Sequence, residues 1–421
     1  MGFAFLLTLL TGVPIALVVG LTSLITIVVQ GSIPLNAIPQ YMFMGLDSFP
    51  LLAIPFFVLA GELMSKSGIS KSLINFSLVL FGRMPGALAE VNIVVSIFFA
   101  GITGAAVADT AAVGSVLIPA MKEEGYSAAY SAAVTAASSC IGPIIPPSII
   151  LVVYGIAANT SIAALLIAGI IPGILLGVTQ GVVAYIQAIK NKYPRREQPF
   201  SFAILVTAFI KALPALIMPL IIVGGIMGGV TTATEAAAIA VLYSLLVGFI
   251  SKSIKLKDLP EIIYQASITV GIVLLVISTA KLFSIVIVMN QIPALLTQAF
   301  LSFSTNKIVI LLLINALLLI VGLFMETSAA CIILAPILLP IVVALGIHPV
   351  HFGIIMCVNL AIGLATPPVG ATLYVACRIA KVSMTEITKA ILPYLGASVI
   401  GLMLITFIPS ISMFLPNLFV L

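Results

Sequence analysis

Long apolar runs separated by short polar segments dominate this sequence. The runs cover residues 2–29, 50–65, 72–82, 88–121, 128–157, 164–189, 204–229, 235–251, 262–291, 306–345, 350–380 and 390–415. Because a helix needs about 20 apolar residues to cross a bilayer, the pattern predicts an all-α polytopic membrane protein. The first run is longer than a signal-peptide core and follows no basic segment, so we expect a retained membrane helix there.

Two runs, 88–121 and 306–345, are too long for one crossing, and small or polar residues occupy their centres, at 101–110 and 322–328. We interpret each as a re-entrant helical hairpin that enters and leaves the membrane on the same side. Turned backbone at that depth is tolerated only where it is buried in protein or lines a wet cavity. The sequence therefore predicts ten crossings and two hairpins.

Basic residues give the expected orientation. With ten crossings, thirteen fall on one face: Arg83, Lys122, Lys190, Lys192, Arg195, Arg196, Lys211, Lys252, Lys255, Lys257, Arg378, Lys381 and Lys389. The other face has three, Lys66, Lys71 and Lys307, and Lys281 lies within a span. Because Lys and Arg favour the cytoplasmic side, the first face is expected to be cytoplasmic and both termini to lie outside.

The chain also repeats itself. Matching Asp109 with Glu326 gives an offset of 217, which pairs Leu117 with Leu334 and Pro119 with Pro336; after a four-residue insertion the offset becomes 221. The later matches are Gly125 with Gly346, Gly142 with Gly363, Pro146-Pro147 with Pro367-Pro368 and Pro172 with Pro393. Each half has an odd number of crossings, so the halves, 1–195 and 196–421, are expected to be inverted repeats. Inverted repeats with interrupted helices are typical of secondary transporters.

Each repeat contains a Gly/Pro interruption, at 142–148 and 363–370. Proline removes an amide donor and disfavours helix in the residue before it, so both segments, 128–157 and 350–380, are expected to be broken helices. Freed carbonyl oxygens suit a hard cation, and helix amino ends suit a carboxylate. A ligand-free kink is the simpler alternative, and two matched breaks facing two hairpins make it less favourable.

Asp109 and Glu326 lie just beyond the two hairpin tips. Carboxylates within the membrane are costly and functional by default. Proton coupling, gating and helix capping are the roles open to them.

Composition narrows the classes further. Of the 421 residues 62% are hydrophobic and 7% are charged, which excludes a soluble enzyme, a nucleic-acid binder and a disordered chain. Cys140, Cys331, Cys357 and Cys377 have no metal or pairing spacing. Catalytic and nucleotide-binding motifs are absent, so the chain is not expected to be an enzyme, and transport would draw on an ion gradient.

Several segments together resemble a known family. The segments 45–62, 101–114, 142–148, 322–327 and 359–370 are similar, in order and across the whole chain, to the large membrane subunit (DctM) of tripartite ATP-independent periplasmic (TRAP) transporters. The resemblance implies a bacterial inner-membrane, sodium-coupled importer of organic acids such as C4-dicarboxylates, sialic acids or other sugar acids. A periplasmic binding protein would deliver the substrate, and a separate small four-helix membrane subunit would complete the scaffold.

The resemblance also implies an elevator mechanism and sites. A transport domain, 88–157 and 306–380, would slide against the remaining helices. Sodium would bind Ala100, Thr103, Gly142, Ile145 and Pro147 at a first site and Gly322, Gly363, Thr366 and Val369 at a second. The substrate is expected near Ser138, Ser139, Asn359, Thr327 and Ser328. No organic cofactor is implied.

Other functions stay open on the sequence alone. A proton-coupled carrier would use Asp109 or Glu326, and a channel or a structural membrane subunit would also accommodate two hairpins. The sequence does not identify the acid.

Overall fold

The described part of the chain is helical. The structure is a computed structural model that describes residues 2–10, 12–31, 33–195 and 201–420, and these residues contain helices and turns but no strand. Eight helices in these ranges are long and apolar enough to cross a membrane. The all-α polytopic class predicted from the apolar runs is therefore confirmed.

The first hairpin and the first broken helix form consecutive elements. They are α6 (Ala87–Thr103), α7 (Ala106–Glu123), α8 (Ala128–Ser138), η2 (Ser139–Ile141) and α9 (Ile149–Ala157). Gly104 turns the hairpin with a φ of +62°, and a Cβ there would overlap the Pro147 carbonyl oxygen. Only glycine fits such a position, so the hairpin tip rests directly on the break. Two helices follow, α10 (Ile162–Ala168) and α11 (Ile170–Lys190), with only Gly169 between them.

The second half has the same succession. Its elements are α16 (Lys307–Phe324), α17 (Thr327–Ala344), α18 (Pro349–Gly363), α19 (Ala371–Ala380) and α20 (Met384–Phe407). Both breaks contain a cis peptide bond at the matched prolines, Pro146-Pro147 and Pro367-Pro368. Each predicted hairpin and each predicted broken helix is therefore present, at the expected place in the sequence.

The two halves interlock through the second parts of their broken helices. α19 packs against α7 and α8 of the first half, while α9 packs against α17 and α18 of the second. The Tyr154 hydroxyl on α9 donates to the Pro349 carbonyl oxygen at 2.9 Å. The hairpins and broken helices thus share one packed core.

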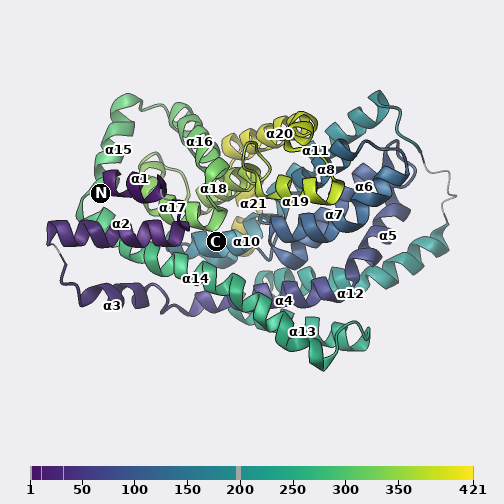
Figure 1. Ribbon diagram of the computed structural model, residues 1–421, viewed down its shortest axis with the longest axis horizontal. Helices are drawn as coiled ribbons and strands as arrows, with labels where there is room; N and C mark the ends of the chain where they lie inside the picture. The colour runs from purple at the N-terminus through teal and green to yellow at the C-terminus, as the bar shows by residue number, and fades with distance from the viewer. Residues whose placement is uncertain (1, 11, 32, 196–200, 421) are drawn as a thin grey trace.

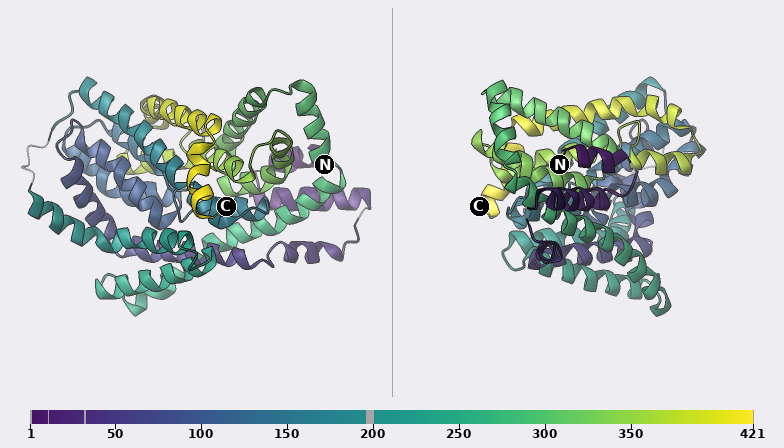
Figure 2. Two further views of the ribbon diagram at one scale, coloured as in Figure 1. Left: turned by 180° about the vertical axis from the view of Figure 1, so that it is seen from behind. Right: turned by 60° about the vertical axis from the view of Figure 1, so that its left-hand side comes forward.

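A layer of helices, most of them long, runs along one side of this core; α3, α4, α12, α13 and α14 lie in the lower part of Figure 1. Its helices are α2 (Ile15–Gln30), α3 (Ala37–Met44), α4 (Ala53–Lys66), α5 (Ile69–Phe81), α12 (Phe202–Met227), α13 (Ala233–Ile250) and α14 (Leu259–Met289). Within the layer α14 packs against α2, α3 and α4, and it also contacts α17 of the core. Figure 2 shows the same layer from behind.

The first apolar run is not one helix, which corrects the expectation for 2–29. It forms α1 (Gly2–Leu10) and α2, which contact each other. Gly12 has a φ of +72°, and Pro14 supplies no amide hydrogen, so α1 ends at Leu10 and α2 begins only after Pro14. The hydroxyls of Thr8 and Thr22 lie 3.2 Å apart, which shows that α1 folds back along α2.

Three further boundaries differ from the apolar runs. The segments between the apolar runs at 30–49 and 292–305 contain α3 and α15 (Ile292–Phe303), respectively. The run 50–65 starts within η1 (Phe49–Leu52) and continues into α4. The run 390–415 divides after α20, because Pro409 interrupts it before α21 (Ser410–Phe419). Hydropathy finds apolar sequence but does not separate one helix from two.

The register of the repeat also needs correction. α7 and α17 begin 221 residues apart, at Ala106 and Thr327, and end 221 residues apart, so no four-residue insertion exists. Glu326 therefore corresponds to Ala105, and Asp109 corresponds to Ala330. Pro336 and Pro340 are one helical turn apart in α17, and Pro119 matches the second of them. The offset of 217 paired Pro119 with Pro336, which lies one helical turn too early in α17.

Candidate functional site

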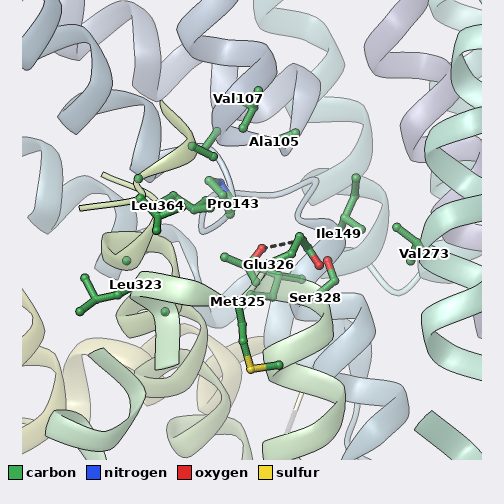
Figure 3. A pocket seen from close by; sticks show the side chains of 18 of the residues that line it. Ala105, Val107, Pro143, Ile149, Val273, Leu323, Met325, Glu326, Ser328 and Leu364 are labelled. Atoms are coloured by element: carbon green, nitrogen blue, oxygen red, sulfur yellow. Dashed lines mark hydrogen bonds between the residues drawn. The ribbon is translucent and has the colours of Figure 1, made fainter. Parts of the chain in front are cut away.

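The two hairpin tips meet at one cavity, which we call the tip cavity. Its volume is about 320 Å³. Its lining comes from both tips (104–107 and 322–328), both breaks (143, 149–150, 363–364 and 369–371) and Thr269 and Val273 of α14. Figure 3 shows Ala105 and Val107 on one side, Glu326 and Ser328 on another, and Val273 at the edge. Because both tips reach the same interior cavity, neither hairpin crosses the core, and the re-entrant interpretation holds.

Four helices begin at the tip cavity. These are α7, α9, α17 and α19, each of which contributes its first residues to the lining. The amino end of a helix carries unpaired N–H groups and a partial positive charge. Arg and Lys are absent from the lining residues. An acid group in this cavity would therefore depend on backbone amides and hydroxyls.

The first break packs around Asp109. This side chain is fully buried in the first turn of α7, and Thr103 Oγ1 donates to its Oδ1 at 2.9 Å. Its Oδ2 has no hydrogen-bond partner among the described residues. A Cβ on Gly142 would lie 3.2 Å from that oxygen, so the break presents bare backbone to the carboxylate.

The second break makes a closer backbone contact. A Cβ on Gly363 would lie 2.6 Å from both the carbonyl carbon and the oxygen of Gly322. Gly363 is therefore needed for this approach between α16 and α18, and a Cβ on Gly322 would lie a tight 3.3 Å from the Gly363 Cα. The Thr366 hydroxyl donates to the Ile362 carbonyl oxygen at 2.7 Å, and Val369, on the same break, is 42% exposed and lines the tip cavity.

The residues expected to bind sodium therefore lie in two groups. Around the first break, Thr103, Gly142 and Pro147 adjoin the hairpin tip. The Ala100 carbonyl oxygen accepts from the Gly104 amide at 3.2 Å, and the Ile145 side chain packs on Gly173 of α11. The second group is Gly322, Gly363, Thr366 and Val369. Three or more His, Cys, Asp or Glu side chains do not cluster anywhere in the described ranges, so a cation here would take mostly backbone and hydroxyl oxygens.

The residues expected near the substrate divide between two places. Thr327 and Ser328 line the tip cavity. Ser138, Ser139 and Asn359 are fully buried away from it, and a substrate role for these three stays a prediction.

Their buried partners explain this separation. Ser138 Oγ lies 2.9 Å from Ser96 Oγ on α6, and Ser139 Oγ donates to the Thr135 carbonyl oxygen. In the second half Asn359 Nδ2 donates to Asn315 Oδ1 on α16 at 2.8 Å. The repeat-equivalent residues Ser138 and Asn359 thus each join a broken helix to the first arm of its hairpin.

Glu326 is the N-cap of α17. Its Oε2 accepts from the Ala329 amide at 2.9 Å, and its Oε1 accepts from the Thr327 hydroxyl at 3.0 Å. Capping, one of the roles left open by the sequence, is therefore confirmed for Glu326 and does not apply to Asp109, because the N-cap of α7 is Ala105.

Several lining residues had no signal in the sequence. Val107, Ile149 and Leu364 are ordinary apolar residues in apolar runs. Thr269 and Val273 come from α14, far from any motif. The amino ends of α7 and α9 were recognisable as helix starts after a turn, but the contribution of α14 depends on how the two layers pack.

Hairpins and broken helices in matched pairs around an interior cavity define a secondary-transporter class of membrane protein. A solved structure supports the fold: the chain is similar to the Alcanivorax borkumensis YdaH transporter, with a TM-score of 0.59, 17% identity, and coverage of 86% of this chain and 87% of that one. The topology of YdaH is described as unusual.

Sequence comparison gives the family. Residues 3–411 match the family described as "Tripartite ATP-independent periplasmic transporter, DctM component". The chain therefore belongs to the DctM family, and the resemblance seen in the motifs is confirmed.

Relatives in this family have transporter names. The chain is 43% identical to the isethionate TRAP transporter permease protein DctMQ of Oleidesulfovibrio alaskensis, over 97% of this chain and 65% of that protein. It is 38% identical to the sialic acid TRAP transporter large permease SiaM of Vibrio cholerae and 36% identical to the C4-dicarboxylate large permease DctM of Rhodobacter capsulatus; each match covers 99% of this chain and 98% of the relative. The chain is thus a multi-pass membrane transporter component.

Proposed function

We propose that this chain is the large permease subunit of a TRAP transporter that imports an organic acid together with sodium. The tip cavity is the observation that supports this proposal most. Four helix amino ends line it without any Lys or Arg side chain, and the end of α17 is already capped by the Glu326 carboxylate. The amino ends of the other three helices would favour an anion. The relatives named for isethionate, sialic acid and C4-dicarboxylates are named for organic acids.

Sodium fits the two breaks chemically. A hard cation prefers oxygen ligands, and the broken helices bring carbonyl oxygens of 142–147 and 363–369 next to the hairpin tips. The close Gly322–Gly363 contact and the Thr366 hydroxyl support the second site. Sodium bound at both breaks would lie beside the acid and lessen its charge during the crossing.

An elevator movement is the mechanism that we infer. The hairpins and broken helices form one interlocked core, and α14 and its neighbours form a layer that packs against it. The tip cavity lies between them, because Thr269 and Val273 of α14 close it on one side. Sliding of the core along α14 would carry the cavity across the membrane without unfolding either hairpin.

Partners and location follow the family. We propose a periplasmic binding protein that delivers the acid, a small four-helix membrane subunit, and a bacterial inner membrane with both termini periplasmic. The name DctMQ of the isethionate relative, of which this chain spans 65%, is consistent with a large and a small subunit in one protein there.

Reconstituted uptake tests the proposal. The complete transporter in liposomes, with its binding protein, is offered a panel of organic acids with an inward sodium gradient or with equal sodium on both sides. We expect saturable uptake of at least one acid that requires both sodium and the binding protein. Failure of every acid to enter under the sodium gradient would remove the proposal, and flux that does not require the binding protein would favour a channel.

A proton-coupled carrier is the second candidate, because Asp109 is buried with one carboxylate oxygen unpartnered among the described residues. The same liposomes with a proton gradient but no sodium distinguish the two. Uptake driven by a proton gradient alone would favour the proton-coupled carrier over the sodium-coupled importer.

A further inference from the structure

A second cavity is lined by Lys281, the lysine that the sequence places within a membrane span and on neither face of the membrane. Lys281 lies on α14, eight residues before the helix ends at Met289, and is exposed. It lines a cavity of about 220 Å³, which we call the lysine cavity. Its other lining residues are Met44, Gly45, Ser48, Val153, Ile156, Ala157, Ile277, Ala280, Ser284, Ile332 and Pro336.

The lysine cavity continues the surface on which the tip cavity lies. α14 contributes Val273 to the tip cavity, then Ile277, Ala280 and Ser284 to the lysine cavity. These spacings of four, three and four residues follow one face of a helix. α17 and α9 contribute to both cavities in the same way, with Ser328 followed by Ile332 on α17. The two cavities therefore lie in sequence along one interface between α14 and the core.

The distance between the two cavities along α14 is one that a sliding movement of the core could cover. Lys281 follows Val273 by eight residues, which is about 12 Å along a helix. Lys252, Lys255 and Lys257 precede α14, so the end at Leu259 is expected to be cytoplasmic. The lysine cavity would then lie on the outer side of the tip cavity, where an imported acid arrives.

Lys281 has the chemistry to receive that acid. Its ammonium group makes no hydrogen bond or ion pair with any of the described residues, and Ser48 and Ser284 provide hydroxyls beside it. A lysine within a membrane span is costly without a partner. Phosphate of a lipid headgroup shares the anionic chemistry, but a cavity of 220 Å³ between α14 and the core holds a small acid and not a lipid with its chains.

We propose that the lysine cavity is a second binding site for the acid group of the transported substrate, with Lys281 as its cation. The proposal rests on the proposed acid import. The incoming acid binds Lys281 first, and when the core slides outward the four helix ends of the tip cavity reach the level of this lysine. Lys281 thereby supplies, from the layer that stays in place, the positive charge that the tip cavity lacks.

The test uses the complete transporter in liposomes and varies the concentration of acid-loaded binding protein. For Lys281→Gln we expect the concentration giving half-maximal uptake to rise about tenfold at low salt, with the maximal rate within twofold of wild type. Lys281→Arg should stay within about threefold on both measures. Lys307→Gln, which removes a charge on the same expected face but outside this cavity, is the matched control and should behave as wild type.

Salt and lipid composition separate the possible outcomes. Added salt should raise the concentration of acid-loaded binding protein that gives half-maximal uptake by wild type, because salt screens the charge of the lysine. The same concentration for Lys281→Gln should not change with salt. Normal uptake by Lys281→Gln would overturn the inference and leave the proposed function intact. An effect confined to liposomes with phosphatidylglycerol, and lost in phosphatidylcholine, would assign Lys281 to a lipid headgroup instead and would also overturn it. Failure of wild type with every acid would remove the proposed function and this inference together.

Discussion

At the scale of single residues, Asp109 and Glu326 have different surroundings although both follow a hairpin tip. Asp109 is fully buried with Thr103 as a donor, whereas Glu326 is exposed in the tip cavity and caps its own helix. The corrected repeat register removes any need for them to act as a pair. Each can therefore be tested alone.

Asp109→Asn keeps the size of the side chain and removes its charge. If carbonyl oxygens at the two breaks hold sodium, we expect uptake driven by a sodium gradient alone to persist in this variant. We expect half-maximal uptake to need a higher sodium concentration, because the carboxylate oxygen beside Gly142 is no longer available to favour a cation there. The measurement is uptake against sodium concentration at equal pH on both sides. Complete loss of sodium-driven uptake in a folded variant would assign coupling to the carboxylate.

Gly363→Ala tests the close backbone contact at the second break. A methyl group would lie 2.6 Å from the Gly322 backbone, so the two helices must separate, at a cost of about 1–3 kcal/mol. We expect a lower melting temperature of the purified complex and loss of uptake. Gly396→Ala in α20 is the control, because its Cβ would have no neighbour within 4 Å. Equal melting temperatures and equal uptake for the two variants would show that the Gly322–Gly363 contact contributes neither to stability nor to transport.

At the scale of elements, the hairpins and breaks could be predicted from the sequence because Gly and Pro have local effects. The three prolines at 143–147 leave too few amide donors for a helix, and the small residues near 101–110 mark a turn. The division of 2–29 into two helices depended on Gly12 and Pro14, which an apolar average does not register. The register of α17 was ambiguous because Pro336 and Pro340 both match Pro119 when shifted by one turn.

The candidate site was predicted only where its residues carry a local signal. Thr327 and Ser328 follow a turn and line the tip cavity, but Ser138 and Asn359, which look equally polar in the sequence, have buried partners on the hairpin arms. Thr269 of α14 joins the site through packing between layers. Which polar residue faces a neighbouring helix and which faces a cavity is decided by that packing.

The buried Asn315–Asn359 contact is expected to stabilise the second hairpin against its broken helix. Asn315→Ala removes the side-chain acceptor of the buried Asn359 amide and leaves it only the Asn315 backbone carbonyl oxygen, and the loss of one such hydrogen bond costs about 0.5–1.5 kcal/mol. We expect a clear fall in the melting temperature of the complex. Asn75→Ala on α5, where the side chain is exposed, should change stability by less than about 0.5 kcal/mol. A larger effect at Asn75 than at Asn315 would contradict this view of the core.

At the scale of the whole molecule, the proposed path of the acid involves two bodies. The interlocked core carries the tip cavity with its four helix ends, and the layer that contains α14 carries Lys281. An acid that moves with the core would pass along one face of α14. The central claim is that the tip cavity holds the acid together with sodium and faces each side of the membrane in turn.

Labelling of an introduced cysteine tests this claim most directly. Ser328→Cys places a thiol in the tip cavity, whereas Ser138→Cys, at a fully buried position, serves as the control; the four native cysteines are buried. A membrane-impermeant maleimide is applied to vesicles of each orientation. We predict that Ser328→Cys reacts from both sides, that the acid slows the reaction only when sodium is present, and that Ser138→Cys stays unlabelled. Reaction from one side only, or at a rate that acid and sodium do not change, would contradict the claim.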